Sequence, residues 1–176
     1  LTMGKVFDEI RKKERRGDYL GKTVQLIPHV TDHIKEWWRE IQREEDANVV
    51  LIEIGGTIGD IENELYVEAA RQLQYEEGEE NVLYVHLTYV PVPQGTKEQK
   101  SKPTQQSVNI LQQRGIQPKI IIGRSKKDLD EHIKTKIALF ANIDKKAVIS
   151  GCDVTDIYEI PLRFYDQGIL DIINKE

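Results

Sequence analysis

The sequence "NVVLIEIGGTIGDIENE" at residues 48–64 joins an apolar run to a loop of glycines and acids. Residues 49–52 are typical of a buried strand, and the run ends on a carboxylate, Glu53. Two glycines follow at once, and Asp60 and Glu62 come shortly before the next helical pattern. In a parallel α/β sheet, ligands bind outside the carboxyl ends of the strands. We therefore expect Glu53 to lie at a ligand-binding edge.

The rest of the chain alternates between the periods of helices and strands. Strands separated by helices indicate βαβ units, and near-continuous apolar strands indicate a parallel sheet covered by helices on both faces. We expect Thr31 to cap the second helix, whose apolar face holds Ile34, Trp37, Trp38 and Ile41. The expected helices span 3–15, 31–45, 65–76, 103–115 and 128–141, with a last one from Pro161, and the expected strands span 23–27, 49–54, 81–90, 119–123 and 147–150.

Composition narrows the classes of protein that the chain can belong to. Its 176 residues fit one domain, and the formal net charge of −5 provides no general attraction to nucleic acid or an anionic membrane. No apolar run approaches the roughly 20 residues that span a bilayer. Cys152 is the only cysteine, which excludes an internal disulfide and indicates a reducing cytoplasm. We expect a cytoplasmic protein without nucleic-acid or membrane partners.

The glycine loop has two interpretations. A carboxylate at a strand end can hold Mg²⁺ directly or through water, and the glycines would let the backbone approach phosphates. Glu53 could equally point into solvent. Asp60 and Glu62 could simply begin the next helix, where acids favour the positive end of the helix dipole.

A second candidate site is "KEQKSKPTQQSVNIL" at residues 97–111. Pro103 suits the first turn of a helix, and Lys100 and Lys102 lie just before that turn. A helix N-terminus beside two ammonium groups can bind a triphosphate, although a solvated basic loop is the alternative. Lys136 borders the apolar face of the expected helix 128–141, formed by Leu129, Ile133, Ile137 and Phe140, and either reaches a cleft or stays at the surface.

These motifs together resemble the synthetase (amidoligase) domain of the CTP synthase family. The resemblance covers essentially the whole chain and is carried by "KERRGDYLGKTVQLIPHVTDHIK", "VVLIEIGGTIGDIE", "HLTYVP", "KSKPTQQSV", "GIQPKIIIGRS", "KIALF" and "AVISGCDV". The departures are modest. The family usually has Thr where Ser101 stands, often His at Gln106, Cys in many members at Gly123, and commonly a basic residue at Cys152.

The resemblance implies a fold and a reaction. The fold would be a partial P-loop NTPase, similar to dethiobiotin synthetase, with a mostly parallel sheet and flanking helices. The reaction would be the ATP-dependent amination of UTP to CTP in pyrimidine biosynthesis, through a 4-phosphorylated UTP, with ammonia from a glutaminase domain and feedback inhibition by CTP. A homotetramer is also implied, because the family shares its UTP site between subunits.

The resemblance also assigns residues. Glu53 would bind Mg²⁺, Lys100 and Lys102 would be catalytic, and CTP would contact Asp60, Ile61 and Glu62 together with the UTP residues. Cys152, Asp153 and Val154 would lie near ATP. The UTP residues would be Lys100, Ser101, Lys102, Pro103, Thr104, Gln105 and Lys136.

The family's P-loop segment and its glutaminase domain are not among these 176 residues. We therefore expect the chain to be the C-terminal part of an amidoligase domain, inactive alone. Another P-loop ligase or ATPase of the dethiobiotin-synthetase type, and a non-catalytic nucleotide-binding or assembly module, remain as alternatives.

Overall fold

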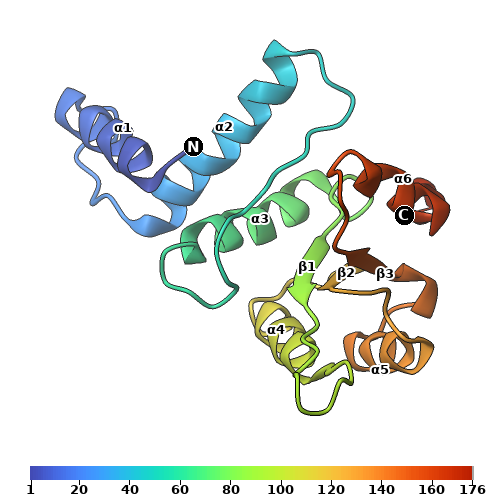
Figure 1. The fold of residues 1–176 in the computed structure, drawn as a ribbon. Coiled ribbons are helices and arrows are strands. Elements are labelled where there is room, and N and C mark those ends of the chain that lie inside the picture. The colour runs from blue at the N-terminus through green and yellow to red at the C-terminus, as the bar shows by residue number, and fades with distance from the viewer. Residues whose placement is uncertain (176) are drawn as a thin grey trace. The chain divides into compact units, whose positions relative to one another are not determined.

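A computed structural model describes residues 1–175. The chain divides into two compact units, with the boundary between Glu77 and Gly78. The N-terminal unit is helical and the C-terminal unit contains a parallel sheet (Figure 1). An α/β fold with a parallel sheet and flanking helices is therefore confirmed. Across the described residues, no helix combines the length and apolar character needed to cross a membrane.

The N-terminal unit consists of α1 (Met3–Arg16), a π-helical turn η1 (Leu26–Val30), α2 (Thr31–Glu44) and α3 (Glu64–Glu77). Helix α1 ends at Gly17, whose φ of +85° favours glycine, and it buries Val6 and Ile10. Helix α2 buries Ile34 and Trp38. The amphipathic spacing of apolar residues explains why both segments fold as helices against one another.

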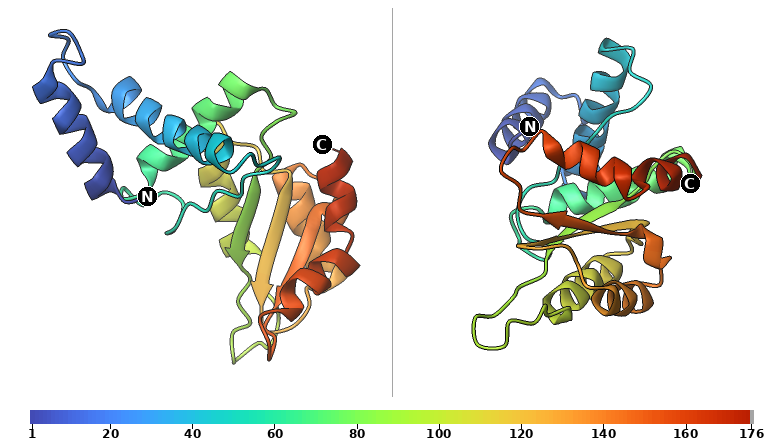
Figure 2. Two further views of the ribbon diagram at one scale, coloured as in Figure 1. Left: turned by 90° about the horizontal axis from the view of Figure 1, so that it is seen from above. Right: turned by 45° about the vertical axis from the view of Figure 1, so that its right-hand side comes forward.

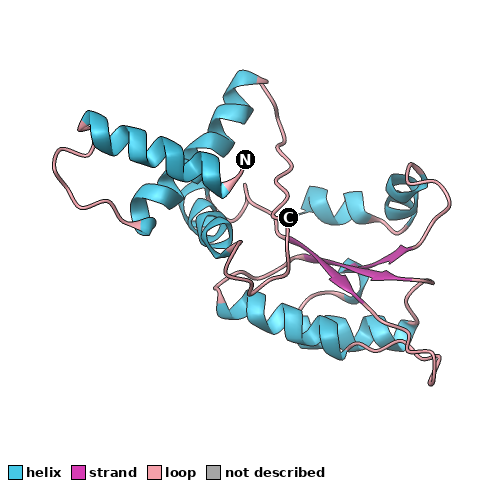
Figure 3. Cartoon of the chain, turned by 60° about the vertical axis from the view of Figure 1, so that its left-hand side comes forward, coloured by secondary structure: helices cyan, strands magenta, loops and turns pink. Residues whose placement is uncertain are grey.

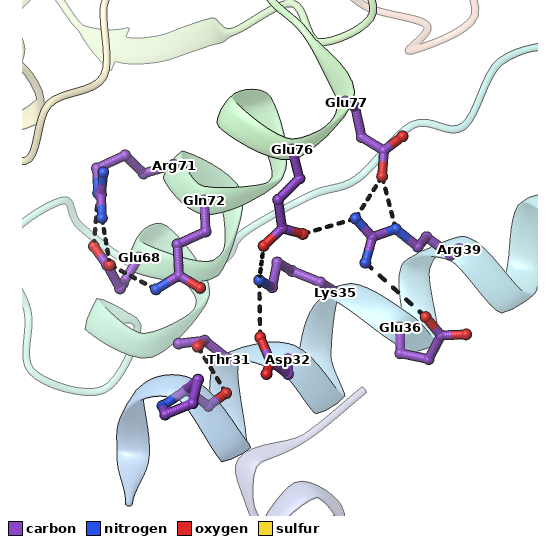
Figure 4. Close-up of polar contacts among 11 residues, drawn as sticks. Thr31, Asp32, Lys35, Glu36, Arg39, Glu68, Arg71, Gln72, Glu76 and Glu77 are labelled. Atoms are coloured by element: carbon purple, nitrogen blue, oxygen red, sulfur yellow. Dashed lines mark hydrogen bonds and ion pairs between the residues drawn. The ribbon is translucent and has the colours of Figure 1, made fainter.

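Charged side chains join α2 to α3 (Figure 4). The Lys35 side chain is only 3% exposed, and its ammonium group pairs with Glu76 and, at 2.9 Å, with Asp32. Arg39 pairs with Glu76 at 2.8 Å and also with Glu77. A buried ammonium group needs such partners because its desolvation is costly. The network therefore links α2 to α3 through charge-assisted hydrogen bonds.

The C-terminal unit has three parallel strands in the order β1 (Val85–Tyr89), β2 (Ile120–Ser125) and β3 (Val148–Cys152), which lie side by side in Figure 2. Helices α4 (Lys102–Gln113) and α5 (Glu131–Ala141) cover one face of the sheet. Helices α6 (Glu159–Asp166) and α7 (Ile169–Lys175) lie on the other face (Figure 3). A short 3₁₀ turn, η2 (Lys145–Ala147), precedes β3.

The core of this unit lies between the sheet and the first pair of helices. Its members are apolar residues that recur with a period of 2 along the strands and of 3.6 along the helices. Both sets of side chains therefore face inward and pack in one layer. The cluster consists of Val90, Val108, Ile121, Leu129, Ile133, Ile137, Ala138, Ala141 and Val148. Phe140, expected on the same face, is 43% exposed.

Two expected strands are absent from the described residues. The segment 23–27 leads into η1 because Pro28 has no N–H, and the Gln25 N–H is donated to the His29 side chain. The segment 49–54 has no regular structure and pairs with no described strand. Val49 and Leu51 are 76% and 93% exposed. The prediction of a strand from the apolar pattern was wrong here, because a strand also needs a neighbouring strand for its backbone hydrogen bonds.

Smaller differences concern helix and strand ends. Thr31 lies inside α2, and its hydroxyl donates to the carbonyl oxygen of Pro28 instead of capping the helix. The last helical stretch begins before Pro161 and is divided at Gly168, whose φ is +80°. Strand β1 is shorter than the expected 81–90, and its residues Val85, Leu87 and Tyr89 are exposed, so the helices cover this face of the sheet only in part.

Candidate functional site

The glycine loop of the N-terminal unit borders a cavity of about 610 Å³. Glu53, Asp60 and Glu62 all contribute to its lining, so the structure brings the three carboxylates to one cavity. The aromatic side chains of Trp37 and Trp38 contribute from α2. Ile61 is 88% exposed and does not line the cavity. The cavity combines an apolar wall with acceptor oxygens, as ligand sites commonly do.

Local hydrogen bonds shape this loop. The N–H of Asp60 donates to the Thr57 carbonyl oxygen at 3.1 Å, and the N–H of Asn63 donates to that of Asp60 at 3.2 Å. The Asn63 side chain donates to the carbonyl oxygens of Gly55, at 3.2 Å, and Thr57, at 3.0 Å. Sequence reasoning missed Asn63, although an asparagine directly before a helix is a recognisable signal.

Two buried polar atoms beside the cavity have no hydrogen-bond partner among the described residues. They are the Oδ1 atom of Asn63 and the hydroxyl oxygen of Tyr66, and both residues line the cavity. Burial raises the pKa of Tyr66, so its hydroxyl is protonated at neutral pH. The loop beside the cavity therefore contains one buried donor and one buried acceptor that the described residues leave unpaired.

The donor set of the loop suits a magnesium ion only in part. Within residues 1–175, no three His, Cys, Asp or Glu side chains gather so that they could hold a metal ion. Glu53, the predicted ligand, offers a hard carboxylate of the kind that Mg²⁺ prefers. This fits Mg²⁺ in nucleotide enzymes, where one or two carboxylates and the substrate phosphates share the ion.

The basic loop of the C-terminal unit follows β1 and leads into α4. Gln99 is 3% exposed, and its side chain bridges two backbone positions beyond β2. It donates to the carbonyl oxygen of Asp128 at 2.9 Å and accepts from the N–H of Asp130 at 2.8 Å. The N–H of Lys100 donates to the Pro91 carbonyl oxygen at 2.9 Å. The loop is thus held on both sides, a role for Gln99 that the sequence did not predict.

Two of the three predicted lysines, Lys100 and Lys136, lie near Glu98. Lys100 pairs with the Glu98 carboxylate at 2.8 Å. The pKa of Glu98 is lowered, first by this hydrogen bond and then by the positive charges of Lys100, His132 and Lys136. Lys136 therefore lies close enough to this loop to act on Glu98 electrostatically, although it comes from α5. The structure brings Lys100 and Lys136 into one basic region of the unit.

The remaining residues of the basic segment are in part buried and in part exposed. Thr104 is fully buried, and its hydroxyl donates to the Tyr89 carbonyl oxygen at 3.4 Å. Ser101 is 9% exposed and accepts a hydrogen bond from the Gln105 side chain at 3.2 Å. Lys102 and Pro103 are exposed in the first turn of α4. A helix start of this kind presents free backbone N–H groups, which favour an anion.

Cys152 is the last residue of β3 at the same edge, and Asp153 and Val154 follow it. The N–H of Asp153 donates to the Ser125 carbonyl oxygen at 3.1 Å, and Arg163 donates to the Cys152 sulfur at 2.8 Å. Burial and the nearby Asp128 raise the pKa of Cys152, so the thiol is not activated as a nucleophile. The segments that follow β1, β2 and β3 therefore meet at the carboxyl edge of the sheet, as expected for a parallel α/β fold.

Comparison with known proteins gives consistent matches. The family model described as CTP synthase N-terminus matches residues 1–176. The CTP synthase of Borreliella afzelii is 51% identical over 176 residues, which is all of this chain and 33% of the relative. That of Methanopyrus kandleri is 53% identical over 173 residues, 98% of this chain and 32% of the relative. The CTP synthase of Pyrococcus abyssi is 54% identical over 169 residues, which is 96% of this chain and 31% of the relative. The chain spans about a third of the length of these curated relatives.

Proposed function

Because the chain belongs to the CTP synthase family, we propose that it carries the amidoligase chemistry of an enzyme that converts UTP to CTP in pyrimidine biosynthesis. The match along the whole chain at about half identity carries this proposal. The γ-phosphoryl group of ATP is transferred to O4 of the uracil ring. Ammonia, released from glutamine by a glutaminase domain, then forms a bond to C4, and phosphate leaves with the former O4 atom.

In the C-terminal unit, the segment Lys100–Gln105 and Lys136 would bind the phosphates of UTP. The lysines supply charge, and the start of α4 supplies backbone N–H groups. Lys100 and Lys102 would be the catalytic pair, because phosphoryl transfer depends on positioning and on cations that neutralise developing charge. Cys152, Asp153 and Val154 would lie near ATP, at the end of β3.

In the N-terminal unit, Glu53 would hold Mg²⁺, which would neutralise phosphate charge during the transfer. Asp60, Ile61 and Glu62 would take the base of the inhibitor CTP. UTP and CTP differ at C4, where uracil has an acceptor oxygen and cytosine a donor amino group. Carboxylates accept hydrogen bonds from an amino group and repel an acceptor oxygen, so these acids would favour the product over the substrate.

A first prediction concerns the three lysines proposed to bind UTP. Lys100→Ala, Lys102→Ala and Lys136→Ala in the full-length enzyme should each weaken UTP binding, by about 1.5–3 kcal/mol for a lost charge-assisted contact. The measurement is the KM for UTP and the direct UTP affinity. Lys146→Ala, an exposed lysine of η2, is the matched control and should leave both unchanged. An unaltered UTP affinity in all three variants would show that the segment is only a solvated basic loop.

A second prediction concerns the acid loop, residues 60–62. Glu62→Ala should raise the CTP concentration that half-inhibits the enzyme by about tenfold, equivalent to 1.4 kcal/mol, with little change in turnover on UTP. The alternative is that Glu62 only helps to begin α3. In that case the variant would lose thermal stability and keep its inhibition. Both quantities should be measured on the same full-length protein.

Other parts of the proposal extend beyond this chain. A homotetramer in the cytoplasm, regulated by CTP, and inactivity of these 176 residues alone remain expectations. A different P-loop ligase of the dethiobiotin-synthetase type would prefer a small carboxylate substrate to UTP. A non-catalytic assembly module would bind nucleotide without turnover. A full-length assay with UTP, ATP, Mg²⁺ and ammonia separates these possibilities, because only a CTP synthase forms CTP.

A further inference from the structure

Asn63 has an unusual orientation for a residue directly before a helix. Its side chain turns back from α3, and its Nδ2 atom donates to the carbonyl oxygens of both Gly55 and Thr57. The residue is 6% exposed, so these bonds are shielded from water. Buried donors paired in this way contribute more to a local structure than exposed ones do.

The start of α3 does not need this side chain. At such a position an asparagine commonly uses its side-chain oxygen to accept from the N–H of the third helical residue. Here that N–H, from Tyr66, is donated instead to the backbone oxygen of Asn63 at 3.0 Å. The Oδ1 atom of Asn63 has no partner among residues 1–175. The side chain therefore holds the loop and not the helix.

The two carbonyl groups lie on either side of Gly56 in the glycine loop. Gly56, between them, has a φ of +90°, and a Cβ atom there would lie 3.1 Å from the Asn63 Nδ2 atom. The Thr57 oxygen also accepts the N–H of Asp60. A displacement of Thr57 would thus move Asp60, and a displacement of Gly55 would move the end of the segment that carries Glu53.

We propose that Asn63 is a positioning residue that fixes the loop 55–62, so that its carboxylates face the cavity and can recognise the base of CTP. The inference rests on the proposed function, because it assigns a regulatory consequence to the same loop. No other described side chain donates to both Gly55 and Thr57.

Asn63→Asp in the full-length enzyme tests this role. Aspartate has the same shape and is as good a residue before a helix, but it replaces the donating NH₂ with an oxygen that faces two carbonyl oxygens. We expect the amide of Asp60, whose N–H is bonded to the Thr57 carbonyl oxygen, to exchange at least about tenfold faster, as a local opening of residues 55–62 becomes easier. The half-inhibitory CTP concentration should rise about tenfold. Asn63→Ser, which keeps one donor, should be intermediate.

Asn109→Asp is the matched control, because Asn109 is exposed on α4. It should leave both the exchange of residues 55–62 and the CTP inhibition as in the wild type. If Asn63 serves only the helix, Asn63→Asp will behave like this control, and the proposal is wrong. Faster exchange without a change in inhibition also contradicts the positioning role, provided that Glu62→Ala does weaken inhibition.

Glu62→Ala and Asn63→Asp together test the CTP assignment of the loop separately from the role of Asn63 in holding it. If Glu62→Ala and Asn63→Asp both leave CTP inhibition unchanged, the assignment of the acid loop to CTP fails. Faster exchange in Asn63→Asp would then still support its role in holding the loop. If exchange is also unchanged, both the loop-holding role and the CTP assignment are excluded.

Discussion

Replacing Glu53 by glutamine in the full-length enzyme is expected to reduce CTP formation roughly a thousandfold. Glutamine keeps the shape of the side chain but removes the negative charge that a hard cation requires. The loss corresponds to about 4 kcal/mol of transition-state stabilisation, within the several kcal/mol that a metal ion supplies. The measurement is CTP formation from UTP, ATP and ammonia at ordinary and raised Mg²⁺.

Two controls make this result specific. Glu45→Gln changes an exposed glutamate of the same unit and should leave the rate unaltered. Hydrolysis of glutamine should largely survive in Glu53→Gln, because the proposed function assigns it to a separate domain. Near-normal CTP formation at ordinary Mg²⁺ would show that Glu53 is not a metal ligand.

Lys35→Ala should destabilise the N-terminal unit by about 2 kcal/mol, because it removes a shielded ammonium group whose acidic partner, Glu76, is itself 37% exposed. The change leaves Glu76 without its buried partner and removes the packed side-chain stem. Urea unfolding can be followed by the fluorescence of Trp37 and Trp38, the chain's two tryptophans, which both lie in α2.

Lys35→Met and Lys12→Ala are the comparisons for this experiment. Methionine fills most of the same volume, so its cost should be smaller than that of alanine. Lys12 also forms ion pairs, with Asp8 at 2.9 Å and Glu9 at 2.8 Å, but its side chain is 53% exposed. Lys12→Ala should cost far less than Lys35→Ala, because exposed ion pairs contribute little to stability. Equal losses for Lys35→Ala and Lys12→Ala would contradict the importance of burial.

The network also gives the unit an acid-sensitive stability. Burial works to raise the pKa of Glu76, but the hydrogen bonds from Lys35 and Arg39 outweigh it, so the pKa is lowered from 4.5. A carboxyl group with a depressed folded pKa stabilises the fold above its unfolded pKa. This contribution is therefore lost as the pH falls below about 4.5, where the unfolded chain binds the proton first.

Much of the fold could be predicted from periodicity. Helices α1, α2, α3 and α4 lie within one or two residues of the expected ranges, because each has a continuous apolar stripe. The three observed strands were also expected. The strand predicted for residues 49–54 is absent, because an apolar run forms a strand only when a neighbouring strand is present.

The candidate sites show a similar division. Spacing along the chain indicated that Glu53, Asp60 and Glu62 belong together, because a turn of a few residues keeps them near one another. Gln99 and Asn63 could not be identified in this way. Their bonds reach backbone groups 29 and 8 residues away, and only the folded path of the chain makes those groups neighbours.

The bridge that Gln99 forms to the backbone of Asp128 and Asp130 affects the entropy of ligand binding. A free loop must lose its conformational freedom when an anion arrives, at about 1–2 kcal/mol for each residue that becomes ordered. In this chain that loss occurs during folding, before any ligand is present. Capture of an anion by the basic loop should then proceed without a slow ordering step, and much of the intrinsic attraction becomes observed affinity.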